Sequence, residues 1–307
     1  MQTISGVPVS RYSFGTMQFG GKADETDAAS MYADCRAAGI NFFDTAYAYQ
    51  GGKSEEITGR LIAGERDDIF LATKTGDGKC VAPDVIHREF AESRKRLNQE
   101  TVDLLYIHQW DPVTPLETSL GAIAEYVRSG AVRYVGVSNF ASWQIMKARQ
   151  IAANLGFEVT VVQQMYNLVK RQSEVEVLPM AESEGLAVCP YSPLGGGLLT
   201  GKYAAGDEGR LSHDKMYIAR YAPNWMHKAA TDLSELAADM GVHPATLAVA
   251  WVARNTGVWG PIISARSSEQ LAPSLAAMEF EMDDQLYARI SALSPTPPPA
   301  NDRLEEA

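Results

Sequence analysis

The chain has 307 residues, of which 46% are hydrophobic and 21% are charged, a composition typical of a folded globular protein. The 38 acidic residues outnumber the 27 basic ones, and the resulting net charge of −11 repels nucleic-acid phosphates and anionic membrane surfaces. A mainly disordered chain is therefore excluded, and we expect no nucleic-acid partner and no membrane partner.

The lack of a targeting segment and the spacing of the cysteines both bear on the cellular compartment. No stretch reaches the roughly 20 apolar residues that span a bilayer, and residues 1–15 lack an apolar segment behind basic residues. Cys35, Cys80 and Cys189 are odd in number, far apart and never spaced C-x-x-C, so we expect buried thiols. Together these signals predict a cytoplasmic protein.

Short apolar runs alternate with longer amphipathic segments along nearly the whole chain. The runs predict eight strands, at residues 12–14, 40–43, 69–72, 102–107, 132–137, 159–162, 186–189 and 261–263. The amphipathic segments predict helices at residues 27–38, 54–63, 83–97, 115–129, 142–155, 173–184, 227–240 with 244–254, and 268–278. This alternation predicts either a closed parallel barrel or a doubly wound sheet.

Proline and glycine mark the ends of these helices. Prolines stand near three helix starts, where a missing N–H is tolerated: Pro83, Pro115 and Pro244. Glycines follow five helices, where a left-handed residue closes the last turn: Gly39, Gly130, Gly156, Gly185 and Gly241. The punctuation therefore agrees with the helix boundaries given by periodicity.

Three segments depart from the alternation. Residues 3–9 predict a small β-hairpin that turns at Ser5-Gly6. Residues 190–226 are rich in glycine and show no obvious helix or strand, which is typical of a functional loop. Residues 295–307 carry four prolines and predict an extended or disordered tail. Residues 1–294 contain no linker.

Polar residues follow the predicted strands at the point where each one ends. Asp44, Lys74 and His108 follow the second, third and fourth runs. The later runs are followed by Ser138 and Asn139, Gln163 and Gln164, Tyr191 and Ser192, and Arg266. If the runs form a parallel barrel, all these groups lie on its C-terminal rim, where such barrels hold their active sites.

The chemistry of the first three groups and Tyr49 fits the transfer of a proton to an oxygen. A phenol is a weak acid, and the ammonium of Lys74 would lower the pKa of Tyr49, while Asp44 would keep Lys74 charged. His108 would donate a hydrogen bond to the substrate oxygen. This arrangement suits reduction of a carbonyl by hydride, because the oxygen becomes negative in that reaction.

Several separated motifs occur together and in order. They are Asn41-Phe42-Phe43-Asp44-Thr45-Ala46 with Tyr49, Gly52-Lys53-Ser54-Glu55, Ala72-Thr73-Lys74, Tyr106-Ile107-His108, Gly136-Val137-Ser138-Asn139-Phe140 and Tyr191-Ser192-Pro193-Leu194. With these motifs the chain resembles the aldo-keto reductase family, from the N-terminal hairpin to about Leu293. The resemblance implies a (β/α)8 TIM barrel that reduces aldehydes or ketones with NADPH and uses no metal.

The resemblance also implies residue roles. Tyr49 would be the general acid, Asp44 and Lys74 the pair that tunes it, and His108 the group that orients the substrate. The implied cofactor-binding residues are Thr16, Met17, Asp44, Ser138, Asn139, Gln164, Tyr191, Ser192, Pro193, Leu194, Gly195, Lys202, Ala265, Arg266 and Gln270. Among them, Tyr191 would stack on the nicotinamide.

Charge favours the same cofactor at its phosphate end. Arg266 precedes a capping pattern from Ser267 to Gln270, and a guanidinium beside a helix N-terminus suits the 2′-phosphate of NADP. The glycine-rich residues 195–202 would let backbone amides approach a pyrophosphate, with Lys202 as the charge partner.

Other motif classes are absent from the sequence. No Rossmann fingerprint, P-loop or nucleophile elbow occurs, and the five histidines lack metal-ligand spacing. For the substrate pocket we expect Trp110 first, with further wall candidates at Met17, Gln18, Phe19, Tyr47, Trp225 and Met226. Such a wall suits apolar or aromatic carbonyls.

The sequence therefore predicts a cytoplasmic NADPH-dependent aldo-keto reductase, with one barrel domain over residues 1–294 and a tail over residues 295–307. Two alternatives keep the barrel. Lys74 would be the Schiff-base nucleophile of an aldolase-type enzyme in the first. In the second, the chain would be a cofactor-binding regulatory subunit with little turnover, as some members of this family are for potassium channels. The sequence does not identify the substrate or the oligomeric state.

Overall fold

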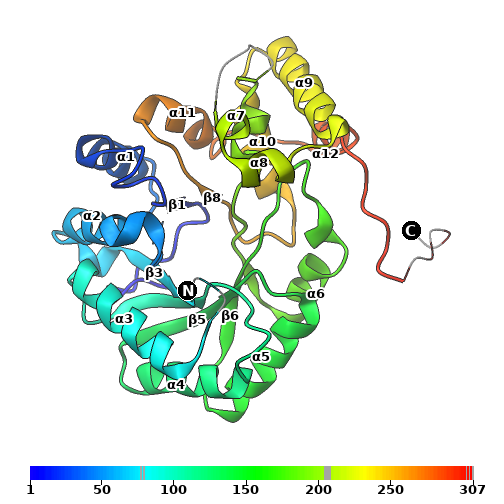
Figure 1. Ribbon diagram of the computed structural model, residues 1–307. Helices are drawn as coiled ribbons and strands as arrows, with labels where there is room; N and C mark the ends of the chain where they lie inside the picture. Colours follow the sequence, from blue (N-terminus) through cyan, green and yellow to red (C-terminus); the bar gives the residue numbers. More distant parts are fainter. Residues whose placement is uncertain (77, 79, 204–208, 302, 304, 306–307) are drawn as a thin grey trace.

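The computed structural model describes residues 1–76, 78, 80–203, 209–301, 303 and 305, and Figure 1 shows its helices arranged around a central set of parallel strands. All eight predicted strands are present. They are β1 (Ser13–Gly15), β2 (Phe42–Asp44), β3 (Phe70–Thr75), β4 (Val102–Ile107), β5 (Val132–Ser138), β6 (Val159–Gln163), β7 (Ala187–Val188) and β8 (Ile262–Ile263). Every ladder between neighbours is parallel, in the order β7-β6-β5-β4-β3-β2-β1-β8.

Hydrogen bonds between the two edge strands close the sheet. The amide of Trp259 donates to the carbonyl of Val188 at 2.9 Å, and the amide of Ile262 donates to the carbonyl of Pro190 at 2.9 Å. These bonds join the segments around β7 and β8, so the sheet curls into a barrel rather than an open doubly wound sheet. The predicted (β/α)8 architecture is confirmed.

The predicted helices are also present, with boundaries shifted by a few residues at most. They are α1 (Glu25–Ala37), α2 (Lys53–Ile62), α3 (Pro83–Leu97), α4 (Leu116–Arg128), α5 (Ser142–Asn154), α6 (Val177–Glu184), α9 (Asn224–Asp239), α10 (Pro244–Arg254) and α11 (Ser268–Ala276). Gly185 closes α6 with a φ of 67°, as its position predicted, whereas α3 ends on Asn98 with a φ of 52°.

The connection after β7 is more structured than the sequence predicted. It contains the 3₁₀ segment η4 (Gly195–Thr200) and the short helices α7 (Arg210–His213) and α8 (Lys215–Arg220). Asp214 caps α8 by accepting hydrogen bonds from the amides of Met216 and Tyr217. Helices this short show no periodicity, so the expectation of a structureless loop over residues 190–226 was wrong. Residues 204–208 of this expected loop lie outside the described residues.

A further helix, α12 (Asp284–Ser291), follows α11 and was not predicted. Three short 3₁₀ turns complete the elements: η1 (Tyr49–Gly52), η2 (Arg66–Asp68) and η3 (Gln172–Glu174). Residues 295–301 carry no helix or strand. The division into a barrel domain and a tail at residue 294 stays a prediction.

The predicted N-terminal hairpin is confirmed and lies at the end of the barrel where the strands begin. Gln2 bridges Pro8 in antiparallel fashion, and the amide of Thr3 donates to the carbonyl of Val7 at 2.9 Å. The guanidinium of Arg133 in β5 donates to the carbonyls of Gln2 and Thr3. The hairpin is therefore tied to the end of the barrel where the strands begin.

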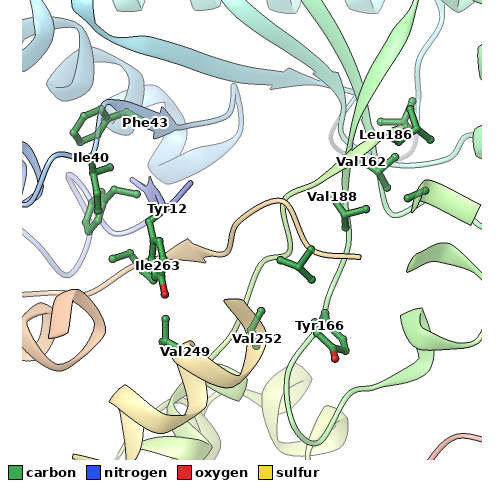
Figure 2. Packing of buried hydrophobic residues seen from close by; sticks show 14 of the residues in the cluster. Tyr12, Ile40, Phe43, Val162, Tyr166, Leu186, Val188, Val249, Val252 and Ile263 are labelled. Carbon is green, nitrogen blue, oxygen red and sulfur yellow. The ribbon is translucent and has the colours of Figure 1, made fainter. Parts of the chain in front are cut away.

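Two layers of apolar side chains hold the fold together. One fills the barrel and includes Phe42, Phe70 and Leu104, and the other lies between strands and helices and includes Phe43 and Ile263. Figure 2 shows part of the second layer, with Val249 and Val252 of α10. Phe42 and Phe43 are neighbours in β2 and join different layers, because successive side chains of a strand point to opposite faces.

The cysteine prediction was right for two of the three thiols. Cys35 and Cys189 are buried, but Cys80 is exposed in the segment between β3 and α3.

The described part of the chain holds no single helix of the length and apolarity that crossing a bilayer requires. The pair α9 and α10 meets those criteria only when taken together, and it is bent by 105°.

Candidate active site

Four predicted side chains meet at the C-terminal rim of the barrel. Asp44 ends β2, Lys74 lies near the end of β3, and His108 directly follows β4. Tyr49 begins η1 in the segment after β2. The Lys74 Nζ donates to a carboxylate oxygen of Asp44 and lies 4.9 Å from the centre of the Tyr49 ring. The rings of Tyr49 and His108 are 6.0 Å apart in an edge-on arrangement.

Lys74 is fully buried and is held in its charged form. Its Nζ donates to Asp44 Oδ1 and, at 2.7 Å, to the carbonyl of Thr45. Burial lowers the pKa of Lys74, but the carboxylate of Asp44 and the phenol of Tyr49 raise it, and the net shift is upward. The site therefore contains a buried ammonium beside the Tyr49 ring.

The second carboxylate oxygen of Asp44 is also occupied. The side-chain amide of Gln163, at the end of β6, donates to Asp44 Oδ2 at 2.9 Å. Gln163 is almost fully buried. Asp44 is consequently held by Lys74 on one oxygen and by Gln163 on the other.

The two remaining groups are neutral in this environment. Burial raises the pKa of Tyr49, and the Lys74 ammonium opposes that rise, as expected, without overcoming it. Burial, helped by the same ammonium, lowers the pKa of His108 to about 3. At neutral pH the site thus presents a protonated phenol and an uncharged imidazole around one cation.

The segment that carries Tyr49 is fastened to β3 and to the segment after β1. The amide of Tyr47 donates to the carbonyl of Lys74 at 3.1 Å, and the side chain of Gln50 donates to the carbonyl of Met17 at 2.8 Å. Gln50 has a φ of 52°, which a non-glycine residue adopts only when its surroundings hold it there. The position of the phenol is therefore set by its neighbours.

Thr16 belongs to the same support. Its fully buried hydroxyl lies 2.8 Å from the hydroxyl of Ser54 and donates to the carbonyl of Asp44 at 3.2 Å. The Ser54 hydroxyl also lies 3.0 Å from that of Thr45. The side chain of Thr16 thus braces the Asp44 segment, and the contacts of Thr16 and Met17 with a cofactor stay predictions.

A chain of hydrogen bonds joins the predicted nicotinamide-binding residues to His108. The Tyr191 hydroxyl donates to Asn139 Oδ1 at 2.7 Å, and Asn139 Nδ2 donates to the carbonyl of His108 at 3.0 Å and to the hydroxyl of Ser138 at 3.1 Å. Asn139 and Ser192 have φ values of 58° and 59°, an uncommon backbone conformation that is concentrated at functional sites.

The two glutamines at the end of β6 contact different partners. Gln164 donates to the carbonyl of Phe140, whereas Gln163 reaches Asp44. The sequence prediction placed both glutamines on the rim but gave a role only to Gln164, whose contact with a cofactor stays a prediction, and it did not foresee the contact of Gln163 with Asp44. Strand alternation was the available signal, because Gln163 is two residues after Val161, whose side chain lies inside the barrel.

A second group of predicted residues lies between β7 and η4 and at the start of α11. The segment that leads into η4 consists of Ser192, Pro193 and Leu194, and Gly195 is the first residue of η4. Within η4, Gly196 and Gly197 have φ values of 68° and 100°. A Cβ on Gly197 would lie 3.1 Å from Lys202 Nζ, so the lysine side chain passes close to the backbone here.

The start of α11 has the predicted cap. Ser267 accepts a hydrogen bond from the amide of Gln270 at 3.3 Å, with Ala265 and Arg266 just before it. The hydroxyl of Ser268, buried at this helix start, has no hydrogen-bond partner among the described residues. A guanidinium, an unoccupied hydroxyl and the amides of a helix N-terminus form a donor set suited to a phosphate.

The matching family model covers residues 11–295 and is described as "Aldo/keto reductase family". The chain belongs to this family.

Named relatives of this aldo/keto reductase match it over most of their length. The uncharacterized oxidoreductase YrpG of Bacillus subtilis is 34% identical over 95% of this chain and 94% of its own. Aflatoxin B1 aldehyde reductase member 2 of Rattus norvegicus is 34% identical over 91% and 83%. A probable voltage-gated potassium channel subunit beta of Oryza sativa is 33% identical over 90% and 89%.

Aromatic residues line the rim of this aldo/keto reductase beside His108. The Trp110 ring packs edge-on against Phe140 at 5.3 Å and against Trp143 at 5.4 Å, and Trp143 is 60% exposed. Of the other wall candidates, Gln18, Phe19 and Met226 are buried, while Trp225 is exposed and Met17 and Tyr47 are partly buried. Across the described ranges, no three His, Cys, Asp or Glu side chains gather into a possible metal site.

Proposed function

We propose that this chain is a cytoplasmic enzyme that reduces small aldehydes or ketones with NADPH, with Tyr49 as the general acid. The observation that carries the proposal is the cluster of Asp44, Lys74, Tyr49 and His108 at one end of the barrel. Family membership supports an oxidoreductase, and two relatives are named as an oxidoreductase and an aldehyde reductase.

The donor set of the rim fits NADPH. Arg266 and the Ser268 hydroxyl, at the start of α11, would hold the 2′-phosphate. Residues 195–202 with Lys202 would hold the pyrophosphate, and Ser138, Asn139 and Tyr191 the nicotinamide. NADPH supplies a hydride when it is bound.

Proton delivery falls to Tyr49. The phenol is protonated at neutral pH, so it is ready to act as an acid. The buried ammonium of Lys74 stabilises the phenolate that forms once the proton has left, and Asp44 keeps that ammonium charged. Gln163 holds the other oxygen of Asp44 and so fixes the direction of the pair.

Substrate orientation falls to His108. Its pKa of about 3 keeps the imidazole neutral, and a neutral imidazole donates one hydrogen bond to a carbonyl oxygen without competing as an acid. Trp110 and Trp143 provide an aromatic wall beside it, which suits apolar or aromatic carbonyl compounds.

The test is Tyr49→Phe. This change keeps the ring and removes the acidic hydroxyl, and we expect kcat to fall at least about 10²-fold while the Kd for NADPH stays the same. Steady-state reduction of a panel of aldehydes and ketones gives kcat, and quenching of tryptophan fluorescence gives Kd. A Tyr49→Phe variant with full activity would remove the proposal.

The Schiff-base alternative is disfavoured by the state of Lys74. A nucleophilic amine must be neutral, but the buried ion pair with Asp44 raises the pKa of Lys74. The regulatory alternative keeps support from the relatives named as potassium channel subunits beta. Sustained NADPH oxidation with any member of the carbonyl panel favours the enzyme, and bound NADPH without turnover favours the regulatory subunit.

A further inference from the structure

A second ion pair, between a fully buried carboxylate and a partly buried guanidinium, lies on the outer side of β3, behind the active site. Glu55, in the first turn of α2, is fully buried, and its Oε2 is 3.3 Å from Arg96 Nη1 near the end of α3. Neither residue has a role in the proton transfer proposed above. Burial of a charged pair is costly, so its place in the fold calls for an explanation.

Glu55 joins this pair to the strand that carries Lys74. The hydroxyl of Thr73 in β3 donates to Glu55 Oε1 at 2.7 Å. Thr73 and Lys74 are consecutive, so their side chains leave the strand on opposite faces. Glu55 therefore holds β3 from outside at the point where Lys74 enters the barrel.

Arg96 joins the same pair to the segment that carries Tyr49. Its Nη1 donates to the carbonyl of Tyr47 at 3.0 Å, and its guanidinium lies 4.6 Å from the centre of the Tyr47 ring. A Cβ on Gly52 would lie 2.5 Å from the Arg96 guanidinium carbon, so the chain on the far side of Tyr49 also passes against this group. One guanidinium thus contacts the segment both before and after Tyr49.

We propose that Glu55 and Arg96 are positioning residues that fix the Tyr49 phenol relative to Lys74. The pair links the segment that carries Tyr49 to the strand that carries Lys74, through hydrogen bonds at 2.7, 3.0 and 3.3 Å. This inference rests on the proposed function, because it matters only if the relative position of phenol and ammonium sets the rate.

The test compares Arg96→Lys with a matched control, Glu92→Gln. Lysine keeps the charge next to Glu55 but loses the planar fork that reaches Tyr47 and stacks on its ring. Glu92 contacts the other side of the same guanidinium, at 3.3 Å from Arg96 Nε, and is 40% exposed. We expect Arg96→Lys to lower kcat at least about tenfold with an unchanged Kd for NADPH, because small displacements of a reacting group are costly. Glu92→Gln should keep kcat within about twofold.

A double-mutant cycle separates positioning from general damage to the fold. If Arg96 acts through Tyr49, the double variant Tyr49→Phe/Arg96→Lys should be no slower than Tyr49→Phe alone. Multiplied losses would overturn the inference, as would an Arg96→Lys variant with wild-type kcat. If Arg96→Lys folds poorly, Glu55→Gln/Arg96→Met removes both buried charges together and should show the same non-additivity with Tyr49→Phe.

The same cycle tells the two proposals apart. Full activity of Tyr49→Phe refutes the proposed function. A severe loss of kcat in Tyr49→Phe, combined with independent losses of kcat from the Arg96 variants, refutes only the positioning role and leaves the proposed function standing.

Discussion

Lowering the pH from 7 to 5 should destabilise this protein through His108. The folded protein holds the pKa of His108 near 3, mainly through burial and also through the Lys74 ammonium, whereas an exposed histidine titrates near 6.5. The unfolded chain therefore binds a proton at His108 first as the pH falls. The free energy of unfolding must therefore decrease as the pH falls from about 6.5 toward about 3, because the proton binds more tightly to the unfolded state.

The size of the effect follows from the same two values. At pH 7 His108 is mostly neutral in both states, and at pH 5 it is mostly protonated only in the unfolded chain. With an unfolded pKa of 6.5 and a folded pKa of about 3, the loss in unfolding free energy between pH 7 and pH 5 is about 2 kcal/mol.

The assay is urea unfolding at pH 7, 6 and 5 for the wild type and for His108→Gln, which cannot be protonated. Other titrating groups are common to both proteins, so the wild type should lose about 2 kcal/mol more than the variant. His87→Gln is the control for replacing a histidine elsewhere in the chain, at a partly exposed position. Nuclear magnetic resonance supplies the decisive check, because a His108 ring that titrates near 6.5 in the folded protein would refute the reasoning.

Two further predictions concern the cofactor and the core. Arg266→Ala should raise the Kd for NADPH by about ten- to a hundredfold and leave the Kd for NADH nearly unchanged, since a charge-assisted hydrogen bond contributes about 1.5–3 kcal/mol; equal losses for both would show that Arg266 does not meet the 2′-phosphate. Trp251→Ala should lower the free energy of unfolding by about 3–5 kcal/mol, measured in urea, because the fully buried ring stacks on Tyr287 at 5.7 Å and its Nε1 donates to Ser291 at 2.9 Å. A loss below about 1 kcal/mol would contradict that packing argument.

The barrel was predictable because its signals are local. Apolar runs such as residues 102–107 coincide with β4, and α3 and α10 begin at Pro83 and Pro244 as predicted. The helices that escaped prediction depend on partners distant in the sequence. α12 is held by Trp251 of α10, and the buried Tyr217 of α8 lies against Gly196 of η4, so neither helix shows a long pattern of its own.

The same distinction applies to the site. Asp44, Lys74 and His108 were identifiable because each lies within one residue of the end of a strand, and parallel strands bring those ends together. Gln163 was placed on the rim, but its role beside Asp44 was not assigned, because the sequence does not show which of two neighbouring glutamines faces the barrel interior, and a difference of one residue in a strand changes that face. Arg96 could not be found this way, since nothing local indicates that its guanidinium reaches the carbonyl of Tyr47.

Two ion pairs of this region, one almost fully buried and one partly buried, lie on opposite faces of the same strand. Lys74 and Asp44 meet inside the barrel, and Glu55 receives the hydroxyl of Thr73 outside it while pairing with Arg96. Buried ion pairs usually stabilise a fold no better than apolar side chains of similar volume, so stability alone does not account for two of them beside one segment. Ion pairs differ from apolar contacts because their hydrogen bonds are directional: each one fixes an atom at one distance and angle. The inner pair sets the charge next to the phenol, and the outer pair holds the backbone that carries the phenol. Replacing the outer pair with apolar residues is therefore expected to raise the activation free energy of the reaction by more than it lowers the free energy of unfolding.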